Sequence, residues 1–301
     1  NKILRTVKPK FFFRKIDNKY ENYSTFVKTF SFKKILKFLD RRKKTFKRDF
    51  SSFPSSNIAY IMFTSGSTGE QKGVAIAHNN LLNFISWTQE EYSIKSSDRI
   101  SNLNPLHFDN SVFDIYATLF NGACLVPFGR NELIDTKNLI KKIIKNKVTI
   151  WFSVPSLASN MQNLKQLKMN KFPSLKYSAF CGEALPVEVA NSWKASSPKS
   201  IIENLYGPTE NTIAVMGYRF DKNTKKQSLN DIVPIGKIFK GNYILPSKKK
   251  VFELCISGGQ VFSGYLKNTS LNKKIFTIFK KKKFYRTGDL VKKNKFNNYC
   301  Y

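Results

Sequence analysis

The sequence predicts an α/β fold in which mostly parallel sheets are flanked by helices, followed by a smaller β-rich subdomain. From residue 58 onward, short apolar runs alternate with segments of helical periodicity, a pattern typical of βαβ units around a buried parallel sheet. After residue 221 the helical pattern fades, and short apolar runs separated by Gly and Lys turns follow. With 301 residues, of which 41% are hydrophobic, the chain is long enough to bury a substantial core.

Each element is predicted from local periodicity. In the helix predicted over residues 78–92, Leu81, Leu82 and Ile85 fall on one apolar stripe. The same criterion predicts helices over residues 135–146, 155–164 and 186–195, and strands of the sheet over residues 58–64, 148–152, 175–180 and 201–205. In the β-rich part, short strands are predicted over residues 232–239, 251–257 and 284–289.

These patterns divide the chain into three regions. Residues 1–57 form a strongly basic N-terminal segment, in which apolar residues between positions 32 and 39 fit one short amphipathic helix. This segment is expected to be the remnant of a larger subdomain; the alternative is an element that binds a membrane surface or nucleic acid. Residues 58–220 form the α/β core, and residues 221–301 form the β-rich subdomain.

The net charge of +32 raises the question of a polyanionic partner. The basic residues are mostly lysines in a chain also rich in Asn, Ile and Phe, as expected of an AT-rich coding sequence, so we expect a dispersed, solvated lysine surface and no specific nucleic acid. The four cysteines, Cys124, Cys181, Cys255 and Cys300, form no CxxC pair, which argues against a zinc site or disulfide framework and favours a reducing cytoplasm. Every apolar run is too short to span a bilayer.

The segment from residue 64 to residue 73 has the composition of a phosphate-binding loop. Glycines let backbone N–H groups turn toward one point, hydroxyls add hydrogen-bond donors, and a lysine supplies positive charge. It is not a Walker A loop, because Gln71 stands where that motif requires its second glycine. Taken in isolation, an ordinary flexible loop is the commoner interpretation of such a stretch. The family resemblance described next is what assigns Thr64, Ser65, Gly66, Ser67, Thr68, Gly69 and Lys72 to the polyphosphate.

Five motifs follow one another along the chain between residues 58 and 290. They read IAYIMFTSGSTGEQKGV (58–74), HFDNSVFDIY (107–116), NLYGPTE (204–210), ELCISGGQVFSGYL (253–266) and YRTGDL (285–290). In these motifs and their order the chain resembles the adenylate-forming superfamily, which includes acyl-CoA synthetases, firefly luciferase and the adenylation domains of nonribosomal peptide synthetases. The resemblance implies the large domain of such an enzyme.

The resemblance also implies that the chain binds ATP and Mg²⁺ and activates a carboxylate as an acyl-adenylate. An aromatic face suits stacking on adenine, and a carboxylate oxygen suits Mg²⁺. The residues implied are Asn204 and Tyr206 at adenine, Thr209 at the α-phosphate, Glu210 at Mg²⁺ and Asp289 at the ribose hydroxyls, with Gly207 as a further cofactor-binding residue. The implied catalytic residues are Thr64, Lys72, Thr209 and Glu210.

Asp109 in the FDxS motif indicates the class of substrate. Members of the superfamily that activate amino acids place an aspartate here to pair with the substrate's α-ammonium group, whereas acyl-CoA synthetases generally do not. A buried carboxylate would be left unpaired by an uncharged fatty acid, so the residue discriminates strongly. Asp114 is the competing acid, and a role for Asp109 as a helix N-cap is the structural alternative.

The resemblance further implies a small, apolar substrate pocket. The stretch FCGEALP (180–186) is similar to that of D-alanine:carrier protein ligases, in which a cysteine narrows the side-chain site, although Cys181 could equally be a small buried core residue. A small amino acid, with D-alanine favoured, is therefore the expected substrate, and the phosphopantetheine thiol of a carrier protein is the expected acceptor. The implied lining comprises Asp109, Asn110, Phe113, Phe152, Ala179, Cys181, Gly182, Leu205, Ile213 and Ala214.

The chain departs from the superfamily at both ends. The C-terminal lid and its lysine are missing after YRTGDL, and residues 1–57 match the usual N-terminal region poorly, so we expect a fragment that binds ATP but adenylates slowly or not at all. Two alternatives stay open. One is acyl-CoA-synthetase-like activation of a carboxylate, and the other is a non-catalytic remnant whose basic surface binds anionic partners.

Overall fold

The computed structural model describes most of the chain, namely residues 2–7, 11–14, 28–31, 54–65 and 71–301. The amphipathic helix predicted between residues 32 and 39 and the loop residues 66–70 lie outside the described residues. Within the described ranges, none of the helices combines the length and the apolar character that crossing a bilayer requires.

The chain divides into two compact units, Asn1–Pro54 and Ser55–Tyr301. In the first unit, α1 (Lys2–Val7) is followed by β1 (Phe11–Arg14) and β2 (Lys28–Ser31), which pair in parallel. The second unit contains all the remaining elements.

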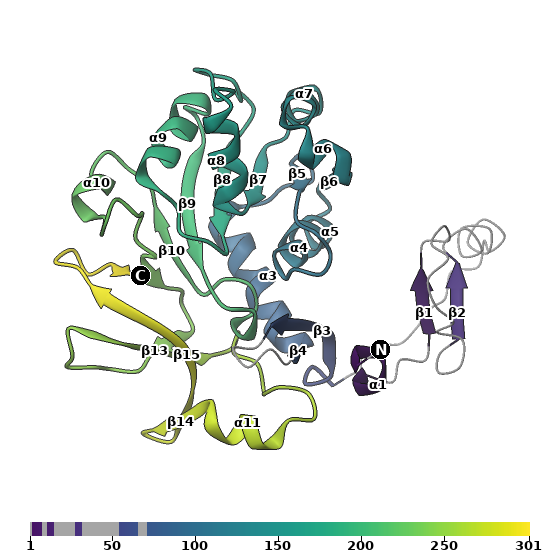
Figure 1. Ribbon diagram of the computed structural model, residues 1–301, viewed down its shortest axis with the longest axis vertical. Helices are drawn as coiled ribbons and strands as arrows, with labels where there is room; N and C mark the ends of the chain where they lie inside the picture. Colours follow the sequence, from purple (N-terminus) through teal and green to yellow (C-terminus); the bar gives the residue numbers. More distant parts are fainter. Residues whose placement is uncertain (1, 8–10, 15–27, 32–53, 66–70) are drawn as a thin grey trace. The chain divides into compact units, whose positions relative to one another are not determined.

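A seven-stranded sheet forms the centre of the second unit, in the order β11-β10-β9-β8-β7-β5-β6 (Figure 1). The five strands from β9 to β6 are parallel, and β10 and β11 add an antiparallel edge. This confirms the predicted α/β class with a mostly parallel sheet. The strands are β5 (Arg99–Asn102), β6 (Cys124–Pro127), β7 (Ile150–Ser153), β8 (Tyr177–Cys181), β9 (Ile201–Tyr206), β10 (Met216–Arg219) and β11 (Lys237–Ile238).

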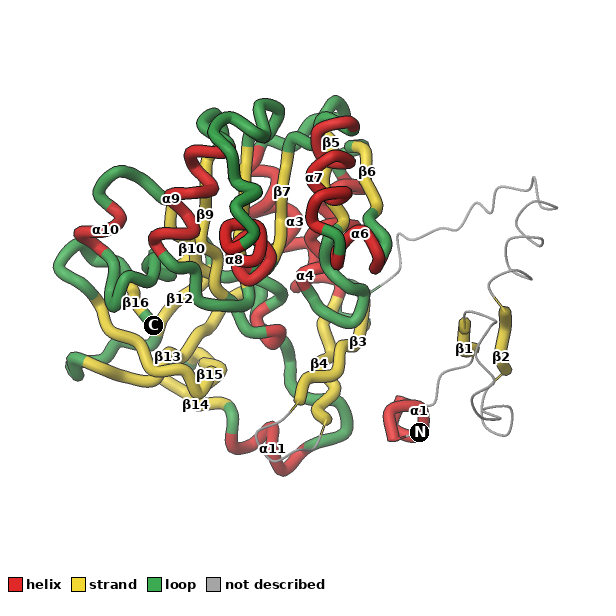
Figure 2. Tube along the Cα trace, turned by 45° about the horizontal axis from the view of Figure 1, so that its top comes forward, coloured by secondary structure: helices red, strands yellow, loops and turns green. Residues whose placement is uncertain are grey.

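Helices cover both faces of this sheet (Figure 2). On one face, α7, α8 and α9 pack over Trp151, whose ring centroid lies 4.6 Å from that of Trp193. On the other face, α3 and the helical segment from α4 to α5 pack over Ile150 and Phe152. Successive side chains of β7 point to opposite faces of the sheet, so Trp151 packs in one core and Ile150 and Phe152 pack in the other. The helices are α3 (His78–Tyr92), α4 (Asn110–Val112), the π-helix η2 (Phe113–Ala117), α5 (Thr118–Phe120), α6 (Arg130–Ile134), α7 (Thr136–Lys145), α8 (Pro155–Asn163) and α9 (Val187–Ser196).

A second sheet of five strands, β12-β13-β15-β14 with β16 beside β15, follows in sequence. Met216 on β10, Leu254 on β13 and Val291 on β15 belong to one buried cluster that joins the two sheets. The elements of this part are the 3₁₀ helix η3 (Thr209–Asn211), α10 (Thr224–Gln227), β12 (Asn242–Ile244), β13 (Val251–Gly258), α11 (Thr269–Lys274), β14 (Phe276–Phe279), β15 (Lys282–Lys293) and β16 (Tyr299–Cys300).

Two local predictions were wrong. The strand predicted over residues 58–64 exists as β3 (Ile58–Ser65), but it pairs antiparallel with β4 (Gln71–Ala77) in a separate two-stranded ribbon rather than joining the parallel sheet. The second error concerns Leu82, which is 46% exposed while Phe84 is buried. The helical period puts Phe84 on the stripe of Leu81 and Ile85, because residues three and four apart share a face. The domain boundaries expected at residues 57 and 220 stay a prediction.

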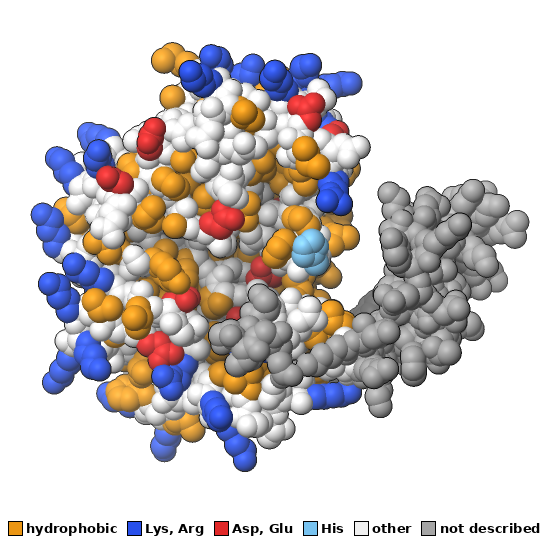
Figure 3. All heavy atoms as spheres, in the orientation of Figure 1, with side chains coloured by type: hydrophobic (Ala, Val, Ile, Leu, Met, Phe, Trp, Pro, Cys, Tyr) orange, Lys and Arg blue, Asp and Glu red, His pale blue; other side chains and the backbone are white. Residues whose placement is uncertain are grey.

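Positive charge is spread over the face of the molecule that Figure 3 shows. In the face shown in Figure 3, Lys and Arg side chains lie mainly around the rim, and several acidic side chains lie nearer the middle. On this face the arrangement agrees with a dispersed lysine surface rather than one concentrated basic patch.

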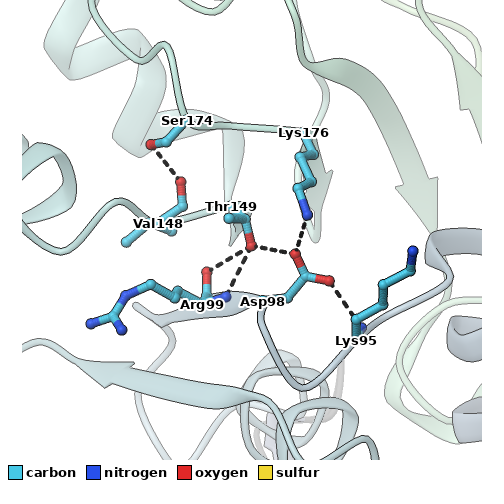
Figure 4. Close-up of polar contacts among 7 residues, drawn as sticks. All are labelled: Lys95, Asp98, Arg99, Val148, Thr149, Ser174 and Lys176. Carbon is cyan, nitrogen blue, oxygen red and sulfur yellow. Dashed lines mark hydrogen bonds and ion pairs between the residues drawn. The ribbon is translucent and has the colours of Figure 1, made fainter.

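Asp98 connects the amino ends of three parallel strands through hydrogen bonds and an ion pair (Figure 4). Asp98, Thr149 and Lys176 each stand immediately before a strand, β5, β7 and β8 respectively. The Asp98 carboxylate accepts hydrogen bonds from Lys176 Nζ at 2.7 Å and Thr149 Oγ1 at 2.9 Å, and its side chain is only 4% exposed. Burial acts to raise the pKa of Asp98, but the hydrogen bonds from Lys176, Lys95 and Thr149 outweigh it and lower that pKa.

Replacing Asp98 with alanine is expected to lower the free energy of unfolding at pH 7 by about 2–3 kcal/mol, because several charge-assisted hydrogen bonds are lost. Since the folded pKa is lowered, the contribution of Asp98 is fully present above the unfolded pKa of about 3.9 and is lost as the pH falls through the folded pKa. Urea unfolding at several pH values measures this. Lys142→Met is the control, because it removes an ion pair with Glu132 that is about one-third exposed on both sides and should cost under about 1 kcal/mol. Equal stability of Asp98→Ala and the original chain at pH 7 would contradict the prediction.

Candidate adenylate site

The loops that leave the carboxyl ends of the parallel strands enclose a cavity of about 510 Å³. Asn104 follows β5, Ser153 ends β7, Glu183 follows β8 and Gly207 follows β9, and all four line it. In open parallel sheets, ligands bind at this edge. The cavity therefore lies at the end of the sheet opposite Asp98.

A second cavity of about 340 Å³ adjoins the first. The two cavities share the lining residues Gly182, Glu183, Gly207 and Pro208. Both are therefore parts of one site, which a ligand with two chemically different halves could fill. We refer to them as the nucleotide cavity, which is lined by Tyr206 and Asp289, and the substrate cavity, which is lined by Asp109.

Asp289 lies between two tyrosines in the nucleotide cavity. Its Oδ2 accepts a hydrogen bond from Tyr206 at 2.5 Å, and its Oδ1 accepts one from Tyr301 at 3.0 Å. Burial, together with the adjacent Asp289 charge, raises the pKa of Tyr206. Each carboxylate oxygen thus already binds a hydroxyl group, so the geometry suits a pair of ribose hydroxyls as partners.

Asn204 is buried in the wall of the nucleotide cavity. Its Nδ2 donates to the carbonyls of Val233 at 3.1 Å and Pro234 at 3.0 Å. Its Oδ1 is buried without a hydrogen-bond partner, which leaves an acceptor for a donor such as an adenine amino group. The residues present therefore fit an adenosine moiety.

Asp109 lies in the wall of the substrate cavity. Burial, with a smaller contribution from the Glu210 charge, raises the pKa of Asp109 to about 6, although a hydrogen bond with the Thr209 side chain opposes the rise. Asp109 stands at the N-cap position of α4, yet its side chain makes no capping hydrogen bond. A cation in the cavity would stabilise this carboxylate, so the site favours a ligand with an ammonium group.

Asp114, the competing acid, is buried in η2 rather than exposed to the cavity. It accepts hydrogen bonds from Asn102 Nδ2 at 3.2 Å and from the backbone and side chain of Asn104, each at 3.1 Å. Burial raises the pKa of Asp114 to about 8 despite these bonds. Asp114 thus fixes Asn104, which lines the cavity, and Asp109 is the aspartate that faces the cavity.

The apolar residues predicted to line the substrate pocket are mostly core residues in this structure. One buried cluster contains Phe113, Phe152, Ala179, Cys181, Leu205, Ile213 and Ala214. Of these, Leu205 lines the nucleotide cavity, while Asp109, Asn110 and Gly182 line the substrate cavity. Burial raises the pKa of the Cys181 thiol, whose Sγ lies 3.8 Å from the carbonyl of Ile213. The assignment of the predicted lining residues as substrate contacts stays a prediction.

The predicted phosphate and metal residues lie around the β3–β4 ribbon and η3. Thr64 on β3 is directly opposite Lys72 on β4. Glu210 is buried in η3 and accepts a hydrogen bond from Tyr265 at 2.6 Å. Ser65 ends β3, and the predicted loop residues Gly66, Ser67, Thr68 and Gly69 lie outside the described residues.

In the described part of the chain, no three His, Cys, Asp or Glu side chains cluster as a metal site. Glu210 is the carboxylate that the resemblance assigns to the predicted Mg²⁺. This fits magnesium chemistry, since Mg²⁺ commonly takes one or two carboxylates and fills its other positions with phosphate oxygens and water.

Sequence analysis missed three residues of the site. Tyr301 carries no motif, since it lies eleven residues beyond YRTGDL, and an isolated tyrosine has no periodic signal. Tyr265 and Glu183 lie inside quoted motifs but were given no role. Glu183 accepts hydrogen bonds from the backbone and hydroxyl of Ser156 at 2.9 and 3.1 Å, and so links β8 to the start of α8.

Comparison with known families gives one decisive match, because the model of the AMP-binding enzymes matches residues 2–266. The chain belongs to the AMP-binding enzyme family. This confirms the resemblance on which the predicted nucleotide residues depend.

Among curated members of the AMP-binding family, the D-alanine–D-alanyl carrier protein ligases of Bacillus mycoides (strain KBAB4) and Bacillus cereus (strain AH187) are each 34% identical over 238 residues. Each match covers 76% of this chain and 47% of the relative. The chain thus spans about half the length of these relatives.

Two solved structures share the fold of this chain. The Vibrio cholerae adenylation domain AlmE, in complex with glycyl-adenosine-5'-phosphate, is 27% identical with a TM-score of 0.77, covering 99% of this chain and 57% of that one. IdnL7 is 32% identical with a TM-score of 0.76, covering 82% of this chain and 50% of that one.

Proposed function

We propose that this protein activates a small amino acid with ATP, forming an aminoacyl-adenylate and pyrophosphate. The observation that carries the proposal is the position of Asp109, an aspartate in a cavity that adjoins a nucleotide-sized cavity with four shared wall residues. An aminoacyl-adenylate has an ammonium group at one end and adenosine at the other, and both cavities offer matching chemistry. The relatives that act on D-alanine, or that bind a glycyl-adenylate, support a small amino acid.

In this reaction a substrate carboxylate oxygen attacks the α-phosphorus of ATP, and the bond to the pyrophosphate oxygen breaks. The chemistry needs orientation and charge neutralisation more than proton transfer. Asp109 would orient the amino acid through its ammonium group, Asn204 and Asp289 would hold the adenosine, and Lys72 would face the phosphates. Mg²⁺ bound at Glu210 would neutralise phosphate charge.

The identity of the amino acid and the fate of the adenylate belong to the same proposal. D-Alanine is the favoured substrate because the D-alanine–D-alanyl carrier protein ligases of two Bacillus species are 34% identical to this chain over 238 residues. Their names further support transfer of the aminoacyl group to a carrier protein. We expect the acceptor to be the phosphopantetheine thiol of that protein and the reaction to take place in the cytoplasm.

The proposal is tested first by binding, because binding does not require turnover. Isothermal titration calorimetry should detect binding of a non-hydrolysable aminoacyl-adenylate analogue with a D-alanyl group. Analogues that carry a bulky aminoacyl group or a fatty-acyl group should bind more weakly. Amino-acid-dependent exchange of pyrophosphate into ATP then tests the chemistry. Preference for a fatty-acyl analogue would overturn the assignment of Asp109, and failure to bind Mg·ATP would support a non-catalytic remnant.

Affinity for the amino acid is expected to fall as the pH drops below about 6. Asp109 has a pKa of about 6 in the unliganded protein, so below that pH it is increasingly protonated and cannot pair with the ammonium group. Titration of D-alanine in the presence of an ATP analogue, between pH 5 and 8, measures this dependence. A pH-independent affinity in this range would contradict it, and adenosine binding serves as the internal control.

A further inference from the structure

Tyr265 lies beside two charged side chains, Glu210, which is assigned to Mg²⁺, and Lys72, which is assigned to the phosphates of ATP. It is buried in the segment between β13 and α11, and its hydroxyl donates to Glu210 Oε1 at 2.6 Å. The Nζ of Lys72 lies 5.5 Å from the centroid of the Tyr265 ring, within the range of a cation–π interaction. One side chain therefore contacts the predicted metal carboxylate through its hydroxyl and the predicted phosphate lysine through its ring.

The backbone around Tyr265 is fixed from both directions. Asn272 accepts from the Tyr265 N–H at 2.7 Å and donates to its carbonyl at 2.9 Å. On the other side, Leu266 N–H donates to the carbonyl of Gly73 at 2.8 Å, next to Lys72. The N–H of Phe262 donates to the carbonyl of Glu210 at 2.8 Å. The segment that carries Tyr265 thus joins the β3–β4 ribbon to η3.

We propose that Tyr265 is a positioning residue that sets the Glu210 carboxylate for Mg²⁺ and the Lys72 ammonium group for the ATP phosphates. The inference rests on the proposed function for the identity of the nucleotide. A carboxylate ligand held by a hydrogen bond has less freedom to lose on binding a metal, and outer partners of this kind change metal affinity by about 10- to 100-fold when removed.

Two substitutions separate the two contacts. Tyr265→Phe keeps the ring beside Lys72 and removes only the hydroxyl, so Mn²⁺ affinity in the complex with a non-hydrolysable ATP analogue is expected to fall about tenfold or more, while affinity for the analogue in excess EDTA stays unchanged. Tyr265→Leu removes the ring as well, so metal-free affinity for the analogue should also fall, by about two- to fivefold. Electron paramagnetic resonance measures bound Mn²⁺, and calorimetry measures the nucleotide.

Tyr218→Phe is the matched control. It removes another buried tyrosine hydroxyl, which bonds Thr224 Oγ1 at 3.2 Å, and should lower thermal stability without changing Mn²⁺ affinity. Glu210→Gln should weaken Mn²⁺ binding at least as much as Tyr265→Phe. If Tyr265→Phe and Tyr218→Phe bind Mn²⁺ equally well in folded protein, the inference is overturned.

These outcomes are independent of the proposed function. A chain that binds Mn²⁺ and the ATP analogue in a Tyr265-dependent way, yet binds no aminoacyl-adenylate analogue, would support the role of Tyr265 and refute amino-acid activation. A chain that activates D-alanine but shows the same Mn²⁺ affinity with and without the Tyr265 hydroxyl would support amino-acid activation and refute the role of Tyr265.

Discussion

Replacing Asp109 with asparagine should lower amino-acid-dependent pyrophosphate exchange by about a hundredfold or more at pH 7. The substrate's ammonium group would then be desolvated in the cavity without its counter-charge, which costs about 3–5 kcal/mol, and each ~1.4 kcal/mol is a factor of ten. Binding of ATP alone should be unaffected, because Asp109 lines the substrate cavity and not the nucleotide cavity. Exchange kinetics and calorimetry with the ATP analogue measure the two effects separately.

The same substitution should make the unliganded protein more stable. Burial raises the pKa of Asp109 in the fold to about 6, so the ionised side chain destabilises the folded state at pH 7 and above. Asparagine removes that cost, which we expect to raise the free energy of unfolding by about 1–3 kcal/mol near pH 8, with the gain vanishing near pH 4. A less stable Asp109→Asn protein at pH 8 would show that Asp109 is a structural residue and would argue against its substrate role.

Replacing Gly207 with alanine is expected to reduce the affinity for Mg·ATP by about tenfold or more and to lower the free energy of unfolding by about 2–3 kcal/mol. A Cβ at Gly207 would lie 2.6 Å from the carbonyl oxygen of Ile213 and 2.7 Å from the Cα of Ala214. Both contacts are to backbone, which cannot rotate away. Ile213 already has a φ of 75°, an uncommon value for a β-branched residue, so the facing segment has little room to adjust.

Because Gly207 lines both cavities, the displacement should affect both halves of the ligand. Calorimetry with the ATP analogue and urea unfolding measure the two consequences. Gly129→Ala is the control, since its Cβ would meet only Glu132 Oε2 at 3.6 Å, an ordinary contact. Unchanged nucleotide affinity in Gly207→Ala would show that the turn after β9 does not contact the nucleotide.

The periodic elements of the fold could be predicted from the sequence. α3 has the predicted bounds of residues 78 and 92, because fifteen residues give an apolar stripe enough repeats to be read. β5 and β6 were missed, since four-residue strands such as Arg99–Asn102 mix polar and apolar residues without a clear period. The antiparallel pairing of β3 depends on β4, which follows the loop, and the local apolar run cannot indicate that partner.

The candidate site could be predicted only where chemistry is carried by a motif. Asp109, Asn204 and Asp289 all line the cavities as expected. Phe113 and Phe152, whose ring centroids lie 4.4 Å apart, belong to the buried core cluster, and their assignment as substrate contacts stays a prediction, because a motif does not distinguish a pocket wall from the layer of side chains behind it. Tyr301 reaches Asp289 only through the pairing of β15 with β16, which is a tertiary effect.

The placement of Asp98 has a consequence for how the protein can change. The ion pair and hydrogen bonds that hold β5, β7 and β8 in register lie before these strands, and the cavity walls lie after them. Substitutions that reshape the loops after the strands leave the anchoring group untouched. Substitutions in these loops that cause no backbone clash of the kind expected at Gly207 can therefore alter substrate preference while the hydrogen bonds of Asp98 stay intact, because the cavity walls and the anchoring group lie at opposite ends of the same strands.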